Sequence, residues 1–314
     1  MKRNLLFLLA ILSLWGCKKE NQPPEDIDIV YGKNRFTTMV DGTEREYYVH
    51  VPQLYKGNVS VPVVFMLHGT SGDGLRFYNI SGWKEVGEEE NILTVFPSSG
   101  KYCIKEDDGT IKHTTKWNAF PSNWDFCDGE TPLDDIKFLH QIIDELKERY
   151  NIDTKRLYVV GFSNGGQMAY RCAFEMSDVF AAVVESAGKG SPVGTPLRNI
   201  PITYQFGNID RKLFPDPNTI IPLAKLDSLL QHSPRFMDMA SDHTGPFQYS
   251  NDYTLSGNTQ TTMTATYRSI PAGENREFRL SLIHGLGHHY PNGTNHPLEG
   301  ARENWEWMKQ YALP

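Results

Sequence analysis

The sequence has no excess of positive charge, and this excludes one large class of function. Its 31 lysines and arginines are outnumbered by 38 acidic residues, and the net charge of −7 is spread along the chain. Proteins that bind nucleic acid need a basic stripe or patch that neutralises phosphates. We therefore expect no nucleic-acid partner.

Long hydrophobic runs are also missing, apart from a short one near the first residue. Two basic residues precede an apolar run over residues 5–14, which is too short to cross a bilayer as a helix and is typical of a signal peptide. The run ends in Leu14-Trp15-Gly16-Cys17. This tetrapeptide resembles the lipobox of bacterial lipoproteins.

The lipobox-like tetrapeptide implies an exported protein with a lipid anchor. Removal of residues 1–16 as a signal peptide would leave Cys17 as a lipid-modified N-terminus, held at the bacterial outer membrane on its periplasmic or its outer side. The alternative is plain secretion, with Cys17 as an incidental thiol. Residues 17–32 are polar and typical of a solvated spacer. We expect one catalytic domain over residues 33–314, which are enough for a single large core.

Cysteine is scarce, since only three cysteines follow Cys17. Thiols of an exported protein can form stable disulfides. Cys103 and Cys127 flank one loop region, whereas Cys172 lies on a predicted helix. We expect a Cys103–Cys127 disulfide and a free, buried Cys172, while the other pairings of these three stay open.

Apolar patterns predict strands that alternate with helices. The alternation implies a doubly wound, mostly parallel sheet with helices on both faces, an α/β class of fold. Residues 216–262 have no clear pattern, and we expect either an insertion over the sheet edge or a lid. The predicted strands cover residues 44–51, 61–67, 92–96, 157–160, 179–184, 202–206 and 278–283. The predicted helices cover residues 83–91, 133–150, the segment after 163, and 298–311.

The strongest functional signal is the pentapeptide Gly161-Phe162-Ser163-Asn164-Gly165, which lies between a predicted strand and a predicted helix. This is the context of a nucleophile elbow, where the serine takes a strained backbone conformation and the small flanking residues let strand and helix pass closely. The turn would place Ser163 at the N-terminus of a helix, whose N–H groups favour a developing oxyanion. We predict that Ser163 is a catalytic nucleophile.

An acid and a base for Ser163 are expected later in the chain. Asp210 follows the predicted strand 202–206, and His288 follows the last predicted strand, so the order Ser163, Asp210, His288 is that of α/β-hydrolases. Asp210 would hold the imidazole tautomer, and His288 would accept the serine proton. Asp216 is an alternative acid. Glycines among the C-terminal histidines argue against a helix that would align them for a metal, so we expect no metal.

The oxyanion hole would need a second donor besides the N–H of Asn164. His68-Gly69-Thr70 follows the strand that should lie beside the elbow, and the backbone N–H of Thr70 is the candidate. We expect His68 itself to brace this loop and to transfer no proton.

Four motifs carry a resemblance to a known group of enzymes. Their residues resemble those of polyhydroxybutyrate-depolymerase-like and feruloyl-esterase-like hydrolases over about residues 33–312. The resemblance implies the α/β-hydrolase fold and ester hydrolysis without a cofactor. Where that group more often has Val-Pro after the acid, Arg211-Lys212 follows here, so the resemblance does not extend to the substrate wall beside Asp210. The motifs are Leu67-His68-Gly69, Gly161 to Ala169, Gly207-Asn208-Ile209-Asp210 and Gly287-His288-His289-Tyr290-Pro291.

We expect an exported serine esterase acting on feruloyl or acetyl esters of plant polysaccharides. Trp117, Trp124 and Tyr290, together with Phe120 and Phe126, would supply aromatic faces for a phenolic ring or a sugar. The alternatives are a polyester depolymerase, a lipase or a peptidase, since fold and triad do not choose the acyl group. Outside the enzymes, the alternative is a surface glycan-binding lipoprotein with a relict hydrolase fold.

Overall fold

The computed structural model describes residues 29–106, 108–120, 126–270 and 276–314. The expected signal peptide, the lipidation site Cys17 and Trp124 lie outside the described residues, as does most of the expected spacer. None of the helices in the described ranges is long and apolar enough to span a membrane.

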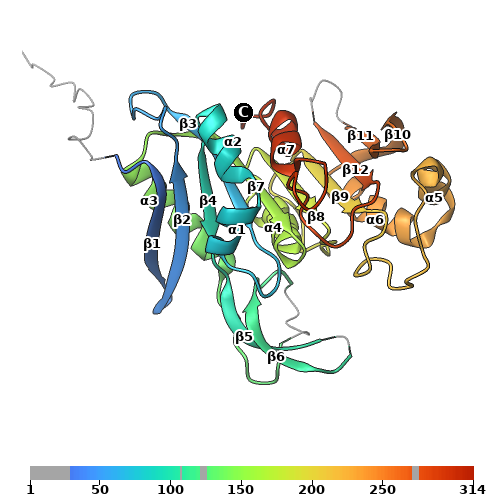
Figure 1. Cartoon of the computed structure of the whole chain (residues 1–314), viewed down its shortest axis with the longest axis horizontal. Helices are drawn as coiled ribbons and strands as arrows, with labels where there is room; N and C mark the ends of the chain where they lie inside the picture. The colour runs from blue at the N-terminus through green and yellow to red at the C-terminus, as the bar shows by residue number, and fades with distance from the viewer. Residues whose placement is uncertain (1–28, 107, 121–125, 271–275) are drawn as a thin grey trace, which may run out of the picture.

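One large sheet runs through the described part of the protein (Figure 1), in the order β1-β2-β4-β3-β7-β8-β9-β12-β11-β10. The strands from β4 to β12 in this order are parallel, and an antiparallel pair extends each edge. The strands are β1 (Gly32–Val40), β2 (Thr43–Val51), β3 (Val61–Leu67), β4 (Leu93–Pro97), β7 (Ile152–Phe162), β8 (Ala182–Ser186), β9 (Ile202–Gly207), β10 (Tyr249–Gly257), β11 (Thr262–Ser269) and β12 (Glu277–Ile283).

Helices cover both faces of the sheet, as a parallel sheet requires. All residues of β3 are buried, because side chains on both of its faces pack under helices. One core contains residues of α1 (Gly74–Ile80), α2 (Trp83–Glu90) and α7 (Gly300–Met308). The other contains residues of α3 (Asp135–Arg149), α4 (Asn164–Glu175), η1 (Leu223–Lys225), α5 (Leu226–His232) and α6 (Pro234–Thr244). The prediction of a doubly wound α/β fold is confirmed.

The order of the strands fixes where a site can lie. The chain passes from β3 outward to β4 and then returns to the other side of β3 with β7, so the direction of winding reverses between β3 and β7. In open α/β sheets, ligands bind outside the carboxyl ends of the strands at such a switch point. The carboxyl ends of β3 and β7 are followed by His68 and Ser163.

Two expectations about local structure need correction or completion. The predicted strand 179–184 is displaced to β8, because Val179 and Phe180 form a turn in which both N–H groups donate to the carbonyl of Met176. Residues 216–262 fold as η1, α5, α6 and the edge strand β10. Phe236 and Met239 of α6 are buried in the core shared with β9 and β12, so this segment covers the end of the sheet as an insertion.

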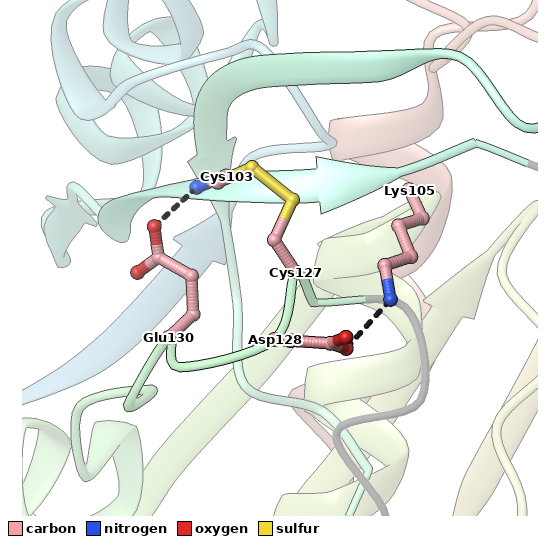
Figure 2. Close-up of a disulfide and its surroundings, with 5 residues drawn as sticks. All are labelled: Cys103, Lys105, Cys127, Asp128 and Glu130. Atoms are coloured by element: carbon pink, nitrogen blue, oxygen red, sulfur yellow. Dashed lines mark hydrogen bonds and ion pairs between the residues drawn. A yellow bond between two sulfur atoms is a disulfide. The ribbon is translucent and has the colours of Figure 1, made fainter.

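A two-stranded hairpin, β5 (Gly100–Lys105) and β6 (Ile111–Lys116), projects from the body of the protein (Figure 1). The structure joins Cys103 of β5 to Cys127 in a disulfide, and Figure 2 shows this crosslink beside the bond from the Cys103 N–H to Glu130. The two contacts tie the hairpin to the chain segment that leads into α3. Cys172 is free and buried.

Removing the disulfide should lower the free energy of unfolding by about 3 kcal/mol, because the crosslink closes a loop between positions 24 residues apart and so restricts the unfolded chain. The measurement is chemical denaturation of the Cys103→Ser/Cys127→Ser variant against the oxidised wild type. Wild-type protein treated with reductant serves as the control and should lose the same amount. A change below about 1 kcal/mol in both samples would contradict the entropic role of the crosslink.

Candidate active site

Ser163 lies in a strained turn between β7 and α4. Its φ of 52° and ψ of −121° place a non-glycine residue in a rarely populated region of backbone space. Its N–H donates to the carbonyl of Ser186 at 2.8 Å, and its carbonyl accepts from the N–H of Gln167 at 3.0 Å. These two bonds hold the strained residue between β8 and the first turn of α4.

The glycines around Ser163 are required by close packing. A Cβ on Gly161 would lie 1.9 Å from the carbonyl oxygen of Gly165, and a Cβ on Gly165 would lie 2.3 Å from that of Leu67. Gly188, which belongs to none of the predicted motifs, has the same role, because its Cβ would lie 1.8 Å from the carbonyl oxygen of Ser163. No side chain fits at these positions, and so the elbow can pass between β3 and β8.

The structure brings Ser163, His288 and Asp210 into one hydrogen-bonded chain. The Nε2 atom of His288 lies 2.9 Å from the Ser163 Oγ, and its Nδ1 atom lies 2.8 Å and 3.0 Å from the two Asp210 carboxylate oxygens. Asp210 is fully buried, whereas the imidazole is partly exposed. With Nδ1 protonated, the free lone pair of Nε2 faces the serine hydroxyl, which is the arrangement that general-base catalysis needs.

The loops after β9 and β12 are locked to each other. β9 and β12 are parallel neighbours, so both loops leave the same edge of the sheet. A Cβ on Gly207 would lie 1.8 Å from the carbonyl oxygen of Leu286, and the side chain of Asn208 accepts from the N–H of Gly285 at 2.7 Å. Asn208 also donates to the carbonyl of Ile221. Asn208 is therefore a positioning residue for the loop that carries His288, and no separate sequence signal marks it.

Backbone N–H groups fix the Asp210 carboxylate from the opposite side. The N–H groups of Lys212 and Leu213 donate to its Oδ1 atom at 2.9 Å and 3.3 Å. Asp216, the alternative acid, instead accepts from Asn218 and Thr219 in an exposed turn. Within the described residues, His288 has Asp210 as its only carboxylate partner.

The candidate oxyanion donors lie beside Ser163. A Cβ on Gly69 would lie 3.1 Å from the Ser163 Cβ, so the loop that carries Thr70 packs directly against the elbow. Asn164 is the first residue of α4, where backbone N–H groups have no partner within the helix. Thr70, Asn164, Ser163 and His288 line one cavity of about 420 Å³. A cavity of about 490 Å³ between α2 and α7 contains none of these four residues, so the chemistry identifies the smaller one as the site.

The expectation that Trp117 contacts substrate is wrong. Trp117 is fully buried, and its indole N–H donates to the carbonyl of His68 at 2.8 Å. Its backbone N–H donates to the Asn164 side chain at 2.6 Å, and its carbonyl accepts from the same side chain. Trp117 thus braces both segments that carry the candidate oxyanion donors, from behind the site.

Tyr290 also has a mainly structural position. It is 5% exposed, and its hydroxyl accepts from the Trp83 indole N–H at 3.0 Å and from the Asn304 amide at 3.1 Å. Burial raises the pKa of this hydroxyl well above its usual range. Part of Tyr290 lines a small cavity of about 170 Å³ that His288 also lines, and only this part of Tyr290 lies near the site. Phe126 is buried against Tyr102, whereas Phe120 lines the larger cavity.

His68 braces its loop, as expected from the sequence. It is fully buried, with Nδ1 2.7 Å from the Gly69 carbonyl and Nε2 accepting from the Ser99 N–H at 3.0 Å. Burial lowers the pKa of His68 to about 4. The imidazole is therefore neutral in the folded protein at neutral pH, with its proton on Nδ1.

Because the pKa of His68 falls from 6.5 in the unfolded chain to about 4 in the folded protein, the unfolded state binds the additional proton between these values. Acidification from pH 7 to pH 4 should therefore remove about 3 kcal/mol of stability through this group. The measurement is the free energy of unfolding at several pH values for the wild type and for His68→Gln. The loss of unfolding free energy on acidification should be smaller by this amount in the variant. Equal losses in both proteins would contradict the lowered pKa of His68.

The sheet topology and the Ser163-His288-Asp210 arrangement define an α/β-hydrolase. The chain belongs to the prolyl oligopeptidase family (Peptidase S9), whose profile matches residues 118–313. The resemblance to feruloyl-esterase-like and polyhydroxybutyrate-depolymerase-like hydrolases is confirmed at the level of the family by the named relatives below.

Three curated relatives illustrate the similarity. A bifunctional acetylxylan esterase/xylanase of Neocallimastix patriciarum is 27% identical over 170 residues, which are 54% of this chain and 22% of the relative. Feruloyl esterase B of Piromyces equi is 23% identical over 86% of this chain and 46% of the relative. Poly(3-hydroxyalkanoate) depolymerase C of Paucimonas lemoignei is 29% identical over 46% of this chain and 31% of the relative. The chain thus spans less than half the length of these relatives.

Among solved structures, an acetyl xylan esterase from Aspergillus awamori superposes with a TM-score of 0.57 at 15% identity. The match covers 88% of this chain and 99% of that one. At this identity the similarity establishes the fold alone.

Proposed function

We propose that the protein is an exported serine esterase that hydrolyses carboxylic esters through an acyl-enzyme intermediate. The observation that carries the proposal is the Ser163-His288-Asp210 chain at a strained strand-to-helix turn. The names of the relatives, which are acetylxylan and feruloyl esterases and a polyester depolymerase, support ester hydrolysis as the reaction class.

The mechanism follows from the positions of these groups. The Oγ of Ser163 attacks the ester carbonyl while Nε2 of His288 takes its proton, and buried Asp210 stabilises the imidazolium that forms. The N–H groups of Thr70 and Asn164 stabilise the oxyanion. The protonated imidazole then gives its proton to the leaving alcohol. Water, activated by His288, hydrolyses the acyl enzyme and restores Ser163.

Location is part of the proposal. The lipobox-like Leu14-Trp15-Gly16-Cys17 supports export with a lipid anchor at the outer membrane. The Cys103–Cys127 crosslink supports export too, because disulfides persist in oxidising compartments. We propose a domain over residues 33–314, tethered by residues 17–32 and acting on material outside the cytoplasm.

The natural ester is proposed to be an acetyl or feruloyl ester of a plant polysaccharide. The cavity lining includes the apolar side chains of Phe120, Phe162 and Leu213. Such a lining suits a small acyl group or a flat phenolic one. A comparison of kcat/KM for methyl ferulate, acetylated xylan oligosaccharides, hydroxyalkanoate oligomers and a triglyceride would rank the candidates. A preference for the triglyceride would overturn the carbohydrate-ester assignment and leave the serine-esterase chemistry standing.

Purified protein should hydrolyse 4-nitrophenyl acetate, lose this activity on reaction with a serine-directed phosphonate, and carry the phosphonate on Ser163. Peptide mapping by mass spectrometry locates the label. Absence of turnover with every ester tested, together with a lack of labelling, would favour a glycan-binding protein with a relict fold. Faster turnover of a matched peptide amide would favour the peptidase alternative.

A further inference from the structure

The charge lining the candidate active-site cavity is opposite in sign to that of the whole chain. The protein carries a net charge of −7. Glu106 is the one carboxylate among the described residues that line the cavity of about 420 Å³. Against it stand five lysines, here called the lysine rim: Lys105, Lys112, Lys116, Lys189 and Lys212.

The lysine rim is assembled from three separate parts of the fold. Three of its members come from the β5–β6 hairpin, which the Cys103–Cys127 disulfide ties to the body of the protein (Figure 2). Lys189 directly follows Gly188, whose backbone touches Ser163. Lys212 follows Asp210 by two residues and donates its N–H to that carboxylate. The cluster is therefore a product of folding and not a charged run of sequence.

Among the described residues, the acidic partners of Lys105 and Lys189 lie outside the cavity, whereas Glu106, the partner of Lys112 at 3.7 Å, lines it. Lys105 pairs with Asp128 at 2.8 Å, as Figure 2 shows, and Lys189 pairs with Asp242 at 2.7 Å, and neither aspartate is a lining residue. Within the described residues, no carboxylate lies within ion-pair distance of Lys212, whose side chain is exposed. Among the described residues, five lysines and one carboxylate therefore line the cavity, and the aspartates that pair with Lys105 and Lys189 do not line it.

We propose that this active site takes esters that carry a negative charge close to the scissile bond. The proposal rests on the proposed esterase function and names its substrate class. A cleft lined by one sign of charge raises the local concentration of oppositely charged ligands, whereas a neutral acetyl ester or a triglyceride gains nothing from five ammonium groups. The charge is a carboxylate, which can sit on the acyl group, as in the half-ester of a dicarboxylic acid, or on the alcohol, as in an acetylated oligosaccharide that contains a uronic acid.

The test compares matched pairs of substrates on the full-length protein. One pair consists of the mono-4-nitrophenyl ester of glutaric acid and 4-nitrophenyl butyrate, and the other of acetylated oligosaccharides with and without a uronic acid. In at least one pair, the ratio of kcat/KM for the anionic over the neutral ester should exceed about tenfold at low salt. It should fall severalfold in about 0.5 M NaCl, because exposed charges are screened over a few ångströms. The pair that responds tells which side of the ester carries the charge.

Lys212 is the member of the rim to change first. Lys212→Glu should lower the anionic-to-neutral ratio by about tenfold, and Lys212→Arg should keep it, since charge and not hydrogen-bond geometry is required. The matched control is Lys147→Glu on the exposed side of α3, which changes the net charge by the same amount and should leave the ratio within about twofold.

Two outcomes would overturn the proposal, and they differ in what they imply. If neutral esters are hydrolysed as fast as their anionic partners in both pairs, with no effect of salt, the preference for anionic esters is refuted. The proposed esterase function then still stands. Absence of turnover with all four substrates would refute both the preference for anionic esters and the proposed esterase function. An equal effect of Lys147→Glu and Lys212→Glu would assign the preference to the net charge of the protein and refute a role of the rim.

Discussion

Ser163→Ala should lower kcat for an ester substrate by about 10⁴- to 10⁶-fold, the range found when a member of a catalytic triad is lost. The substitution removes the attacking oxygen but leaves Thr70, Asn164 and the cavity in place, so weak catalysis by the oxyanion donors would remain. KM should change little, because the hydroxyl makes its covalent bond only after the substrate is bound. Initial rates with 4-nitrophenyl acetate over a range of substrate concentrations measure both constants.

The backbone of Ser163 supplies the control for this experiment. Its φ of 52° is unfavourable for alanine as well as for serine, so Ser163→Ala should unfold at nearly the wild-type temperature. Ser163→Gly relieves the strain and should be stabilised by about 1 kcal/mol while it is equally inactive. An alanine variant that is fully folded and retains more than a tenth of wild-type activity would exclude Ser163 as the nucleophile.

The parts of the fold that sequence could predict are those whose signals are local. β3 is apolar at every position because helices cover both of its faces, and α3 shows one buried stripe of Phe138, Leu139, Ile142 and Leu146. The elbow can be recognised because its two glycines and its serine fall within five residues, although the close approach that Gly165 permits is to Leu67 of β3. In each case the pattern can be recognised within one short segment of the sequence.

The remaining parts depend on contacts between distant segments. The β5–β6 hairpin has few apolar residues, and it is held by the crosslink to Cys127 and by Glu130. Composition predicts that Trp117 contacts substrate, because it cannot distinguish a ring in a cleft from a ring beneath it. The ring lies beneath the cleft because its indole N–H donates to the carbonyl of His68, which is 49 positions away in the chain. The lysine rim cannot be predicted from the sequence for the same reason, since its members come from the β5–β6 hairpin and from the loops after β8 and β9.

Asp210→Asn should lower kcat by about 10⁴-fold without unfolding the protein, and the reason lies in its hydrogen bonds. The Oδ1 atom accepts from the N–H groups of Lys212 and Leu213 and from His288, whereas Oδ2 accepts from His288 alone. The oxygen of an asparagine would stay with the two backbone donors, so its NH₂ group would take the place of Oδ2 and point at Nδ1 of the imidazole.

That NH₂ group can only donate, so Nδ1 would become the acceptor and the imidazole proton would move to Nε2. Nε2 would then donate to the Ser163 Oγ and could no longer accept its proton. Asp216→Asn is the matched control, because Asp216 lies in an exposed turn bonded to Asn218 and Thr219, and its kcat should stay within about twofold of the wild type. Steady-state kinetics of both variants show which aspartate is the acid of the triad, and circular dichroism checks that both variants are folded. An inactive Asp216→Asn beside an active Asp210→Asn would transfer the acid role to Asp216 and leave the buried carboxylate at His288 without a catalytic function.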